Sequence, residues 1–166
     1  WGMTEDPRLI AQGLPSEIPF LLYPKQEEWI NWQIDHWKKG EQRRIFTVKS
    51  RDVGASEAEM ALYGSLGLFY RKINLGIGSR KREYVDSLDQ PDSLLYKVRR
   101  FLQYLPAEFR QGWKEKTCTK LMQVRFPRSK AIITGEAGDG FGRGGRKSIY
   151  GVDEAGFIER AKALEF

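Results

Sequence analysis

One short segment of the chain has the residue types and spacing to bind phosphate groups: Lys49-Ser-Arg-Asp-Val-Gly-Ala-Ser56. The apolar run at residues 45–48 precedes it, and a helix-like run at residues 57–70 follows it. A strand, a tight turn with glycine and a helix, in this order, hold nucleotide phosphates on backbone N–H groups at the helix start. The sequence therefore predicts a phosphate-binding loop here.

The loop departs from the usual phosphate-loop pattern, G-x-x-x-x-G-K-[ST]. Gly54 and Ser56 stand where the pattern has its second glycine and its Ser or Thr. Ser50 replaces the first glycine, and Ala55 replaces the lysine. A cation should neutralise the charge of the β- and γ-phosphates. Lys49, at the start of the loop, is the obvious substitute.

Other residues of the loop have predicted roles as well. Arg51 is a second candidate cation, the Ser56 hydroxyl would bind magnesium, and Gly54 would let the backbone close on the phosphates. The alternative is a surface turn in which Gly54 starts a helix and Ser56 caps it. The nucleotide-binding prediction covers the whole loop: Lys49, Ser50, Arg51, Asp52, Val53, Gly54, Ala55 and Ser56.

A second strand-like segment, residues 149–152, ends in two carboxylates, Asp153 and Glu154. Ligands of open α/β sheets bind at the carboxyl ends of the strands. Asp153 is predicted to hold magnesium, and Glu154 to polarise the attacking water as a general base. The alternative is a solvated acidic pair after a strand. Taken with the loop, the pair favours a magnesium-dependent nucleoside triphosphatase.

Composition sets the broad class of the protein. The 166 residues are 40% hydrophobic and 30% charged, which is typical of a globular domain with a core. The net charge of +6 suits a polyanionic partner, although this signal is weak by itself. The single histidine and single cysteine exclude a zinc site with the usual ligand spacing and an internal disulfide. No apolar stretch approaches the ~20 residues that cross a bilayer.

The elements that must position these residues follow from periodicity and turn signals. An irregular segment is expected first, followed by alternating strands and helices that form a mostly parallel sheet with helices on both faces and a local antiparallel hairpin. Helices are predicted at 25–39, 56–70, 80–88 and 93–105. Strands are predicted at 44–49, 73–77 and 149–152, and a hairpin is predicted from 121–126 and 131–134.

Three further stretches, added to the loop at 49–56, carry a family resemblance: Tyr23-Pro-Lys-Gln26, Gly142-Arg-Gly-Gly-Arg146 and residues 149–158. Together they resemble the large terminase subunits of tailed bacteriophages, the motors that package DNA. Several members of that family place the catalytic lysine at the start of the loop, as in this chain. The resemblance covers about Tyr23 to Ile158.

The resemblance implies an α/β fold of the RecA-like (ASCE) P-loop NTPase class, with a mostly parallel central sheet flanked by helices. An irregular segment at 1–22 would precede the ATPase domain at 23–166. That domain is expected to be truncated at its C-terminus and to lack the nuclease domain. ATP and Mg²⁺ are the implied cofactors.

The resemblance also implies roles for residues outside the loop. Gln26 would contact the adenine edge, with Tyr23 packing nearby. Arg143, or else Arg146, would act as a finger on the nucleotide of a neighbouring subunit. The alternative for both arginines is a basic loop in contact with solvent or DNA phosphates.

Double-stranded DNA, a portal protein, a small terminase subunit and further copies in a ring are the implied partners. The implied location is the cytoplasm of a bacterial host, with no membrane association. Two other functions stay open. Asp-Glu-Ala after a strand also suits a helicase-type ATPase, and Ala55 suits a degenerate nucleotide-binding module.

Overall fold

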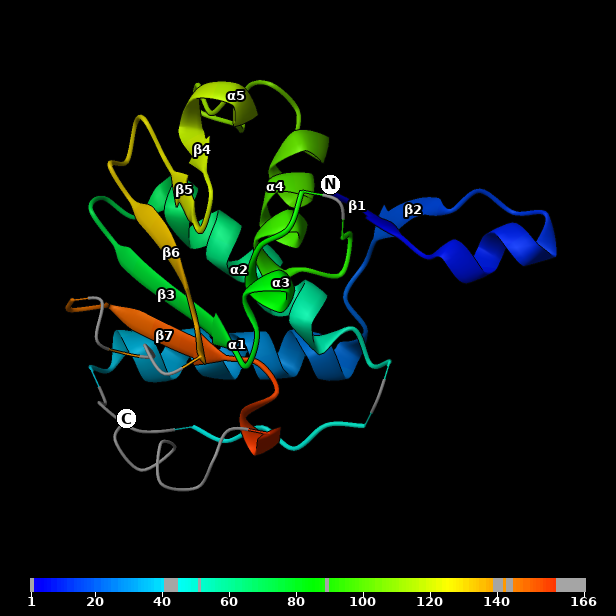
Figure 1. Cartoon of the computed structure of the whole chain (residues 1–166), viewed down its shortest axis with the longest axis horizontal. Helices are drawn as coiled ribbons and strands as arrows, with labels where there is room; N and C mark the ends of the chain where they lie inside the picture. Colours follow the sequence, from blue (N-terminus) through cyan, green and yellow to red (C-terminus); the bar gives the residue numbers. More distant parts are fainter. Residues whose placement is uncertain are drawn as a thin grey trace.

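The computed structural model describes residues 2–40, 45–50, 52–88, 90–138, 142 and 145–157. Figure 1 shows a sheet with helices packed against it, and a two-stranded ribbon that projects away from it. The helices are η1 (Pro7–Gln12), α1 (Pro24–Lys38), α2 (Ala55–Phe69), α3 (Arg82–Val85), α4 (Leu94–Tyr104), α5 (Glu115–Cys118) and η3 (Ala155–Phe157). The strands are β1 (Gly2–Glu5), β2 (Glu17–Phe20), β3 (Asn74–Ser79), β4 (Thr119–Lys120), β5 (Gln123–Arg125), β6 (Ile132–Ala137) and β7 (Ile149–Val152).

The main sheet has five strands in the order β4-β5-β6-β3-β7. β3 runs parallel to both β6 and β7, with Leu75 opposite Ile133 on one side and Ile149 on the other. β5 runs antiparallel to both β4 and β6. The carboxyl ends of β3, β6 and β7 therefore meet at one edge of the sheet, and their amino ends meet at the other.

The prediction of a RecA-like (ASCE) P-loop NTPase fold with a mostly parallel sheet is wrong. The described sheet is mixed, since two of its strand pairs are parallel and two are antiparallel. Short turns join β4 to β5 and β5 to β6, and a short turn can connect only antiparallel neighbours. The chain forms a small α/β fold with an additional antiparallel β1–β2 ribbon.

The strand predicted at 44–49 is wrong for the residues that the structure describes there. Residues 45–50 are extended but pair with no strand in the described part of the chain. The side chains of Phe46 and Val48 are 81% and 99% exposed. The indole of Trp29 donates a hydrogen bond of 3.1 Å to the Thr47 hydroxyl, which holds the segment beside α1. An apolar pattern indicates strand propensity, but a strand also needs a partner edge.

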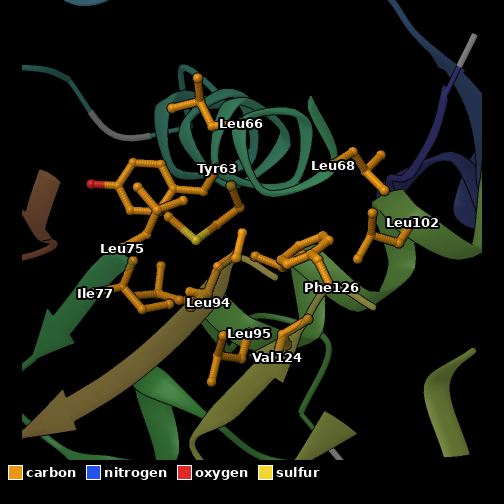
Figure 2. Packing of buried hydrophobic residues seen from close by; sticks show 14 of the residues in the cluster. Tyr63, Leu66, Leu68, Leu75, Ile77, Leu94, Leu95, Leu102, Val124 and Phe126 are labelled. Atoms are coloured by element: carbon orange, nitrogen blue, oxygen red, sulfur yellow. The ribbon is translucent and has the colours of Figure 1, made fainter. Parts of the chain in front are cut away.

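The core lies between the sheet and the helices α2, α3 and α4. α2 is apolar around most of its circumference, as expected for a helix that is covered on several sides. Gly67 faces the ring of Phe126 so closely that an added Cβ would lie 2.3 Å from it. Figure 2 shows Tyr63 of α2 beside Leu75 of β3, with its hydroxyl pointing away from the apolar cluster. Large side chains from helix and sheet therefore interlock in this layer.

Several other predicted elements are confirmed. The helices at 25–39, 56–70 and 93–105 correspond to α1, α2 and α4, and the predicted hairpin corresponds to β5 and β6. The helix predicted at 80–88 is reduced to the single turn of α3. The first twenty residues, predicted to be irregular, contain the β1–β2 ribbon. No helix in the described ranges is long and apolar enough to cross a membrane.

Candidate functional site

The start of α2 and the end of β7 meet through one side-chain hydrogen bond. The Ser56 hydroxyl donates to Oδ2 of Asp153 over 2.8 Å. The other oxygen of Asp153 accepts from the N–H of Glu154 at 3.0 Å, and the Asp153 N–H donates to the Gly78 carbonyl at 2.9 Å. Asp153 is therefore fixed at the carboxyl edge of the sheet, directly in front of the predicted loop.

The loop turns sharply into α2. Gly54 has φ +68°, a left-handed backbone conformation that glycine adopts without the strain of a side chain. Its carbonyl accepts the Ala58 N–H, so that α2 begins at Ala55. The first N–H groups of a helix have no partner within the helix and carry the positive end of its dipole. This geometry suits an anion placed over the loop.

Gln26 joins the start of α1 to the same loop. Its amide nitrogen donates to the Val53 carbonyl at 2.7 Å, and its amide oxygen accepts the Tyr23 N–H at 2.8 Å. A Cβ on Gly54 would lie 2.9 Å from that amide nitrogen, which is a second reason for glycine there. Tyr23 itself is 73% exposed. Gln26 of the predicted adenine motif thus supports the backbone of the loop, and the N–H of Tyr23 holds the Gln26 side chain in place.

A carboxylate that sequence reasoning missed, Glu59 of α2, is close enough to both the predicted lysine and the predicted acid to interact with their charges. Its burial, followed by the negative charge of Asp153, raises the pKa of Glu59 to about 7, while the positive charge of Lys49 acts in the opposite direction. Lys49 and Asp153 therefore both lie within electrostatic range of one carboxyl group. Lys49 is exposed, as expected of a side chain that would contact a ligand from solvent.

Glu59 approaches the sheet where β7 has a glycine. A Cβ on Gly151 would lie 2.6 Å from Oε1 of Glu59 and 2.7 Å from the Tyr63 hydroxyl. Burial, together with the charge of Glu59, raises the pKa of Tyr63 well above its ordinary range, so the hydroxyl keeps its proton. Gly151 thus admits two polar side chains of α2 behind Asp153.

Glu154 faces a cation from the neighbouring strand end. Its Oε2 lies 3.2 Å from Nε of Arg80, the residue that follows β3. Glu154 has φ +57°, a left-handed conformation that is uncommon for a residue with a side chain. Both members of this pair are partly exposed. The ion pair orients the Glu154 carboxylate at the edge of the site.

The remaining predicted residues lie away from this cluster or outside the described residues. The Arg146 carbonyl accepts the side-chain amide of Asn74 at 2.7 Å, which places its backbone at the amino ends of β3 and β7. Asp52 is exposed, with one oxygen 3.9 Å from the guanidinium of Arg8. Ser50 lies in the exposed extended segment before the turn. Arg51 and Arg143 lie outside the described residues.

The described part of the glycine-rich loop is anchored on β6. Oε2 of Glu136 accepts the Gly142 N–H at 2.8 Å and the Tyr150 hydroxyl at 3.0 Å. The ammonium of Lys147 lies 3.8 Å from Oε1 of Glu136. The chain then runs from the carboxyl end of β6 back to the amino end of β7.

The oxygens of Ser56 and Asp153 fit two neighbouring positions around a magnesium ion. Mg²⁺ prefers oxygen ligands at about 2.1 Å in an octahedron, so adjacent ligands are about 3.0 Å apart. The observed separation is 2.8 Å. No group of three or more His, Cys, Asp or Glu in the described ranges could hold a metal by itself. Mg²⁺ that arrives with a nucleotide takes most of its ligands from phosphates and water.

Weak sequence signals existed for the residues that were missed. Glu59 follows Ser56 by three positions, which puts both on one face of a helix. Arg80 directly follows a strand, as catalytic side chains of α/β sheets often do. Neither signal separates a site residue from a solvated surface residue before the packing is known.

A search of the chain against known protein families finds no family that matches, and a search of curated proteins finds no similar sequence.

Proposed function

We propose that the chain binds ATP with magnesium between the loop at 49–56 and the end of β7, and hydrolyses it. One observation carries the proposal: the hydroxyl of Ser56 and the carboxylate of Asp153 lie 2.8 Å apart, although 97 positions separate them in sequence. A hydroxyl from the start of a helix and a carboxylate from a strand end are the two protein ligands of magnesium in many ATPases.

The charges around this pair support the same function. Lys49 supplies a cation that can turn toward phosphate oxygens, and the start of α2 supplies backbone N–H groups. Magnesium, when bound with the nucleotide, would neutralise phosphate charge. Glu154 stands beside Asp153 and would polarise the attacking water, with Arg80 orienting its carboxylate. Gln26 would keep the loop in place through its bond to Val53.

We further propose that this hydrolysis drives double-stranded DNA into a procapsid, as in the ATPase part of a terminase large subunit. The order of the motifs supports this, with a lysine at the loop start and an Asp-Glu pair after a late strand. The net charge of +6 is compatible with a DNA partner. In this proposal a ring of such subunits would contact a portal protein and a small subunit, in a bacterial cytoplasm.

Titration calorimetry with ATP and Mg²⁺, followed by a phosphate-release assay, tests the nucleotide site on the chain. Lys49→Ala and Glu154→Ala are each expected to lower turnover by about 100-fold or more, because each removes charge aligned with the reacting phosphate or water. Glu154→Ala is expected to keep ATP binding, since its carboxylate acts on water.

Lys38→Ala is the matched control, because Lys38 is an exposed lysine at the other end of α1. It should leave both binding and turnover unchanged. Normal turnover in Lys49→Ala would contradict the assignment of the loop.

A second candidate is a module that binds ATP without hydrolysing it. Ala55 in place of the usual lysine favours it, and so does the ion pair that Glu154 forms with Arg80. Tight ATP binding by the unmodified chain with no phosphate release would select this candidate. Clear turnover would exclude it.

A further inference from the structure

A pocket lies at the opposite edge of the sheet from the candidate ATP site. Its volume is about 350 Å³, and its lining residues are Leu68, Phe69, Arg71, Gln111, Arg128 and Ser129. Three turns form it: the one from α2 to β3, the one around residue 111, and the one from β5 to β6. Because β3 and β6 begin directly after two of these turns, the pocket is at the amino ends of the parallel strands.

Two of the three turns are joined by hydrogen bonds. The Ser129 hydroxyl donates to the Gly67 carbonyl in the last turns of α2, and the Lys72 N–H donates to the Ser129 carbonyl at 2.8 Å. Lys72, Gln111 and Lys130 all have positive φ, so each of the three turns is sharply bent. The turn from α2 to β3 and the turn from β5 to β6 are thereby joined to each other before any ligand arrives.

The charged side chains of the lining are positive, and one aromatic ring beside them is exposed. Arg71 and Arg128 are exposed cations, and none of the lining residues within the described part of the chain is acidic. Two guanidinium groups offer parallel N–H donors that match the oxygens of a phosphate. Phe69 is 59% exposed beside them, so its ring is accessible to a ligand in the pocket.

We propose that this pocket binds a nucleotide unit, with its phosphate between Arg71 and Arg128 and its base or sugar against Phe69. Aromatic rings stack on bases regardless of sequence, and arginines hold the backbone phosphate. The volume lies in the range of small-ligand sites. The unit can come from a free nucleoside monophosphate or from a nucleic-acid strand, and both present the same chemistry. The inference does not rest on ATP hydrolysis at the other edge.

The test measures binding without ATP or magnesium, so that its result is separate from that of the proposed ATPase. A fluorescent single-stranded oligonucleotide is titrated by anisotropy at low salt, and AMP and inorganic phosphate are titrated by calorimetry. Arg71→Ala and Arg128→Ala are each expected to weaken oligonucleotide binding about tenfold, because each removes a charge-assisted hydrogen bond. Phe69→Ala should weaken binding of AMP and leave that of inorganic phosphate unchanged.

Arg82→Ala is the matched control, since Arg82 is an exposed arginine that follows the carboxyl end of β3. The substitution removes one positive charge at the carboxyl end of the parallel strands, away from the pocket. It should change binding less than about threefold, because it alters only the long-range electrostatic field of the protein. If AMP binding responds to the pocket variants and oligonucleotide binding does not, the source is the free nucleotide. The proposal is overturned if the pocket variants weaken binding of AMP and of the oligonucleotide no more than Arg82→Ala does. It is also overturned if inorganic phosphate binds as tightly as AMP.

Discussion

Two buried or partly buried carboxyl groups of this chain have opposite surroundings. The side chain of Asp86 is 1% exposed. One of its oxygens lies 2.7 Å from Nη1 of Arg99, and the other accepts the Met122 N–H at 2.6 Å. Glu59 lies against Gly151, where its burial, followed by the negative charge of Asp153, raises its pKa to about 7. The Asp86 carboxylate is therefore paired with a buried cation, whereas the negative charge of Asp153 acts on Glu59 more strongly than the positive charge of Lys49 does.

The different surroundings of Asp86 and Glu59 indicate which of the two regions stabilises the fold. Asp86, at the end of α3, binds Arg99 of α4 and the backbone directly before β5. Its charge therefore stabilises the contacts between these elements. The negative charges of Glu59 and Asp153 repel each other, which costs stability unless a cation binds beside them. A carboxyl group with a raised pKa beside a second carboxyl group, as Glu59 is beside Asp153, is characteristic of sites that bind cations or do chemistry. Four predictions test this contrast, from the largest expected effect to the smallest.

The largest effect is expected for Arg99→Ala. The substitution leaves the Asp86 carboxylate buried without its cation, which typically costs about 3–5 kcal/mol in the free energy of unfolding. Urea titration followed by circular dichroism measures it. Lys25→Ala, which breaks an exposed ion pair with Glu28, should cause a far smaller change. A loss below about 1 kcal/mol for Arg99→Ala would show that Asp86 does not depend on this pair.

Gly151→Ala tests the close approach of α2 to β7. The new Cβ would lie 2.6 Å from Glu59 and 2.7 Å from the buried Tyr63, so one of them must move. Overpacking of this kind costs about 1–3 kcal/mol, measured by the same urea titration. Gly156→Ala is the control, because an added Cβ there meets nothing within 4 Å. Equal stability of the two variants would contradict the described packing.

Glu59 should make stability depend on pH. Its pKa rises from 4.5 in the unfolded chain to about 7 in the folded one. The folded state therefore holds a proton that the unfolded state has lost between these values, so stability falls as pH rises through this window. The fall due to Glu59 is on the order of 1–3 kcal/mol, given its partial contact with water.

Glu59→Gln removes this titration. The difference in unfolding free energy between the variant and the unmodified chain should change with pH from 4.5 to 7 and level off above it. Both proteins are measured by urea titration at each pH. A difference that is constant with pH would place Glu59 in an ordinary, well-solvated environment.

The smallest effect is expected in the extended segment before the loop. Val48 is 99% exposed, so Val48→Thr should change the free energy of unfolding by less than about 0.5 kcal/mol. Val124→Thr is the matched substitution in the core, where the residue is fully buried, and should cost about 1–3 kcal/mol. If Val48→Thr costs as much as Val124→Thr, the segment is packed like a strand after all.

Much of the local structure could be predicted because it depends on neighbours in sequence. The helical spacing of apolar residues predicts α1, α2 and α4, and Pro127 with Ser129 predicts the turn between β5 and β6. The segment at 45–49 has the same apolar character as the strand at 149–152, yet only the second has a partner edge, on β3. Strand formation depends on that distant edge, which local pattern does not encode.

In the candidate site, too, some features depend on neighbours in sequence and others on distant contacts. The sequence by itself determined the loop with Gly54, the start of α2 and the Asp-Glu pair, because turn chemistry and helix starts are decided within a few residues. Only the tertiary structure decided that Ser56 meets Asp153, that Arg80 meets Glu154, and that Glu59 faces Gly151. These contacts follow from parallel pairing of β3 with β7 and from how closely α2 packs on them, and no local preference fixes either.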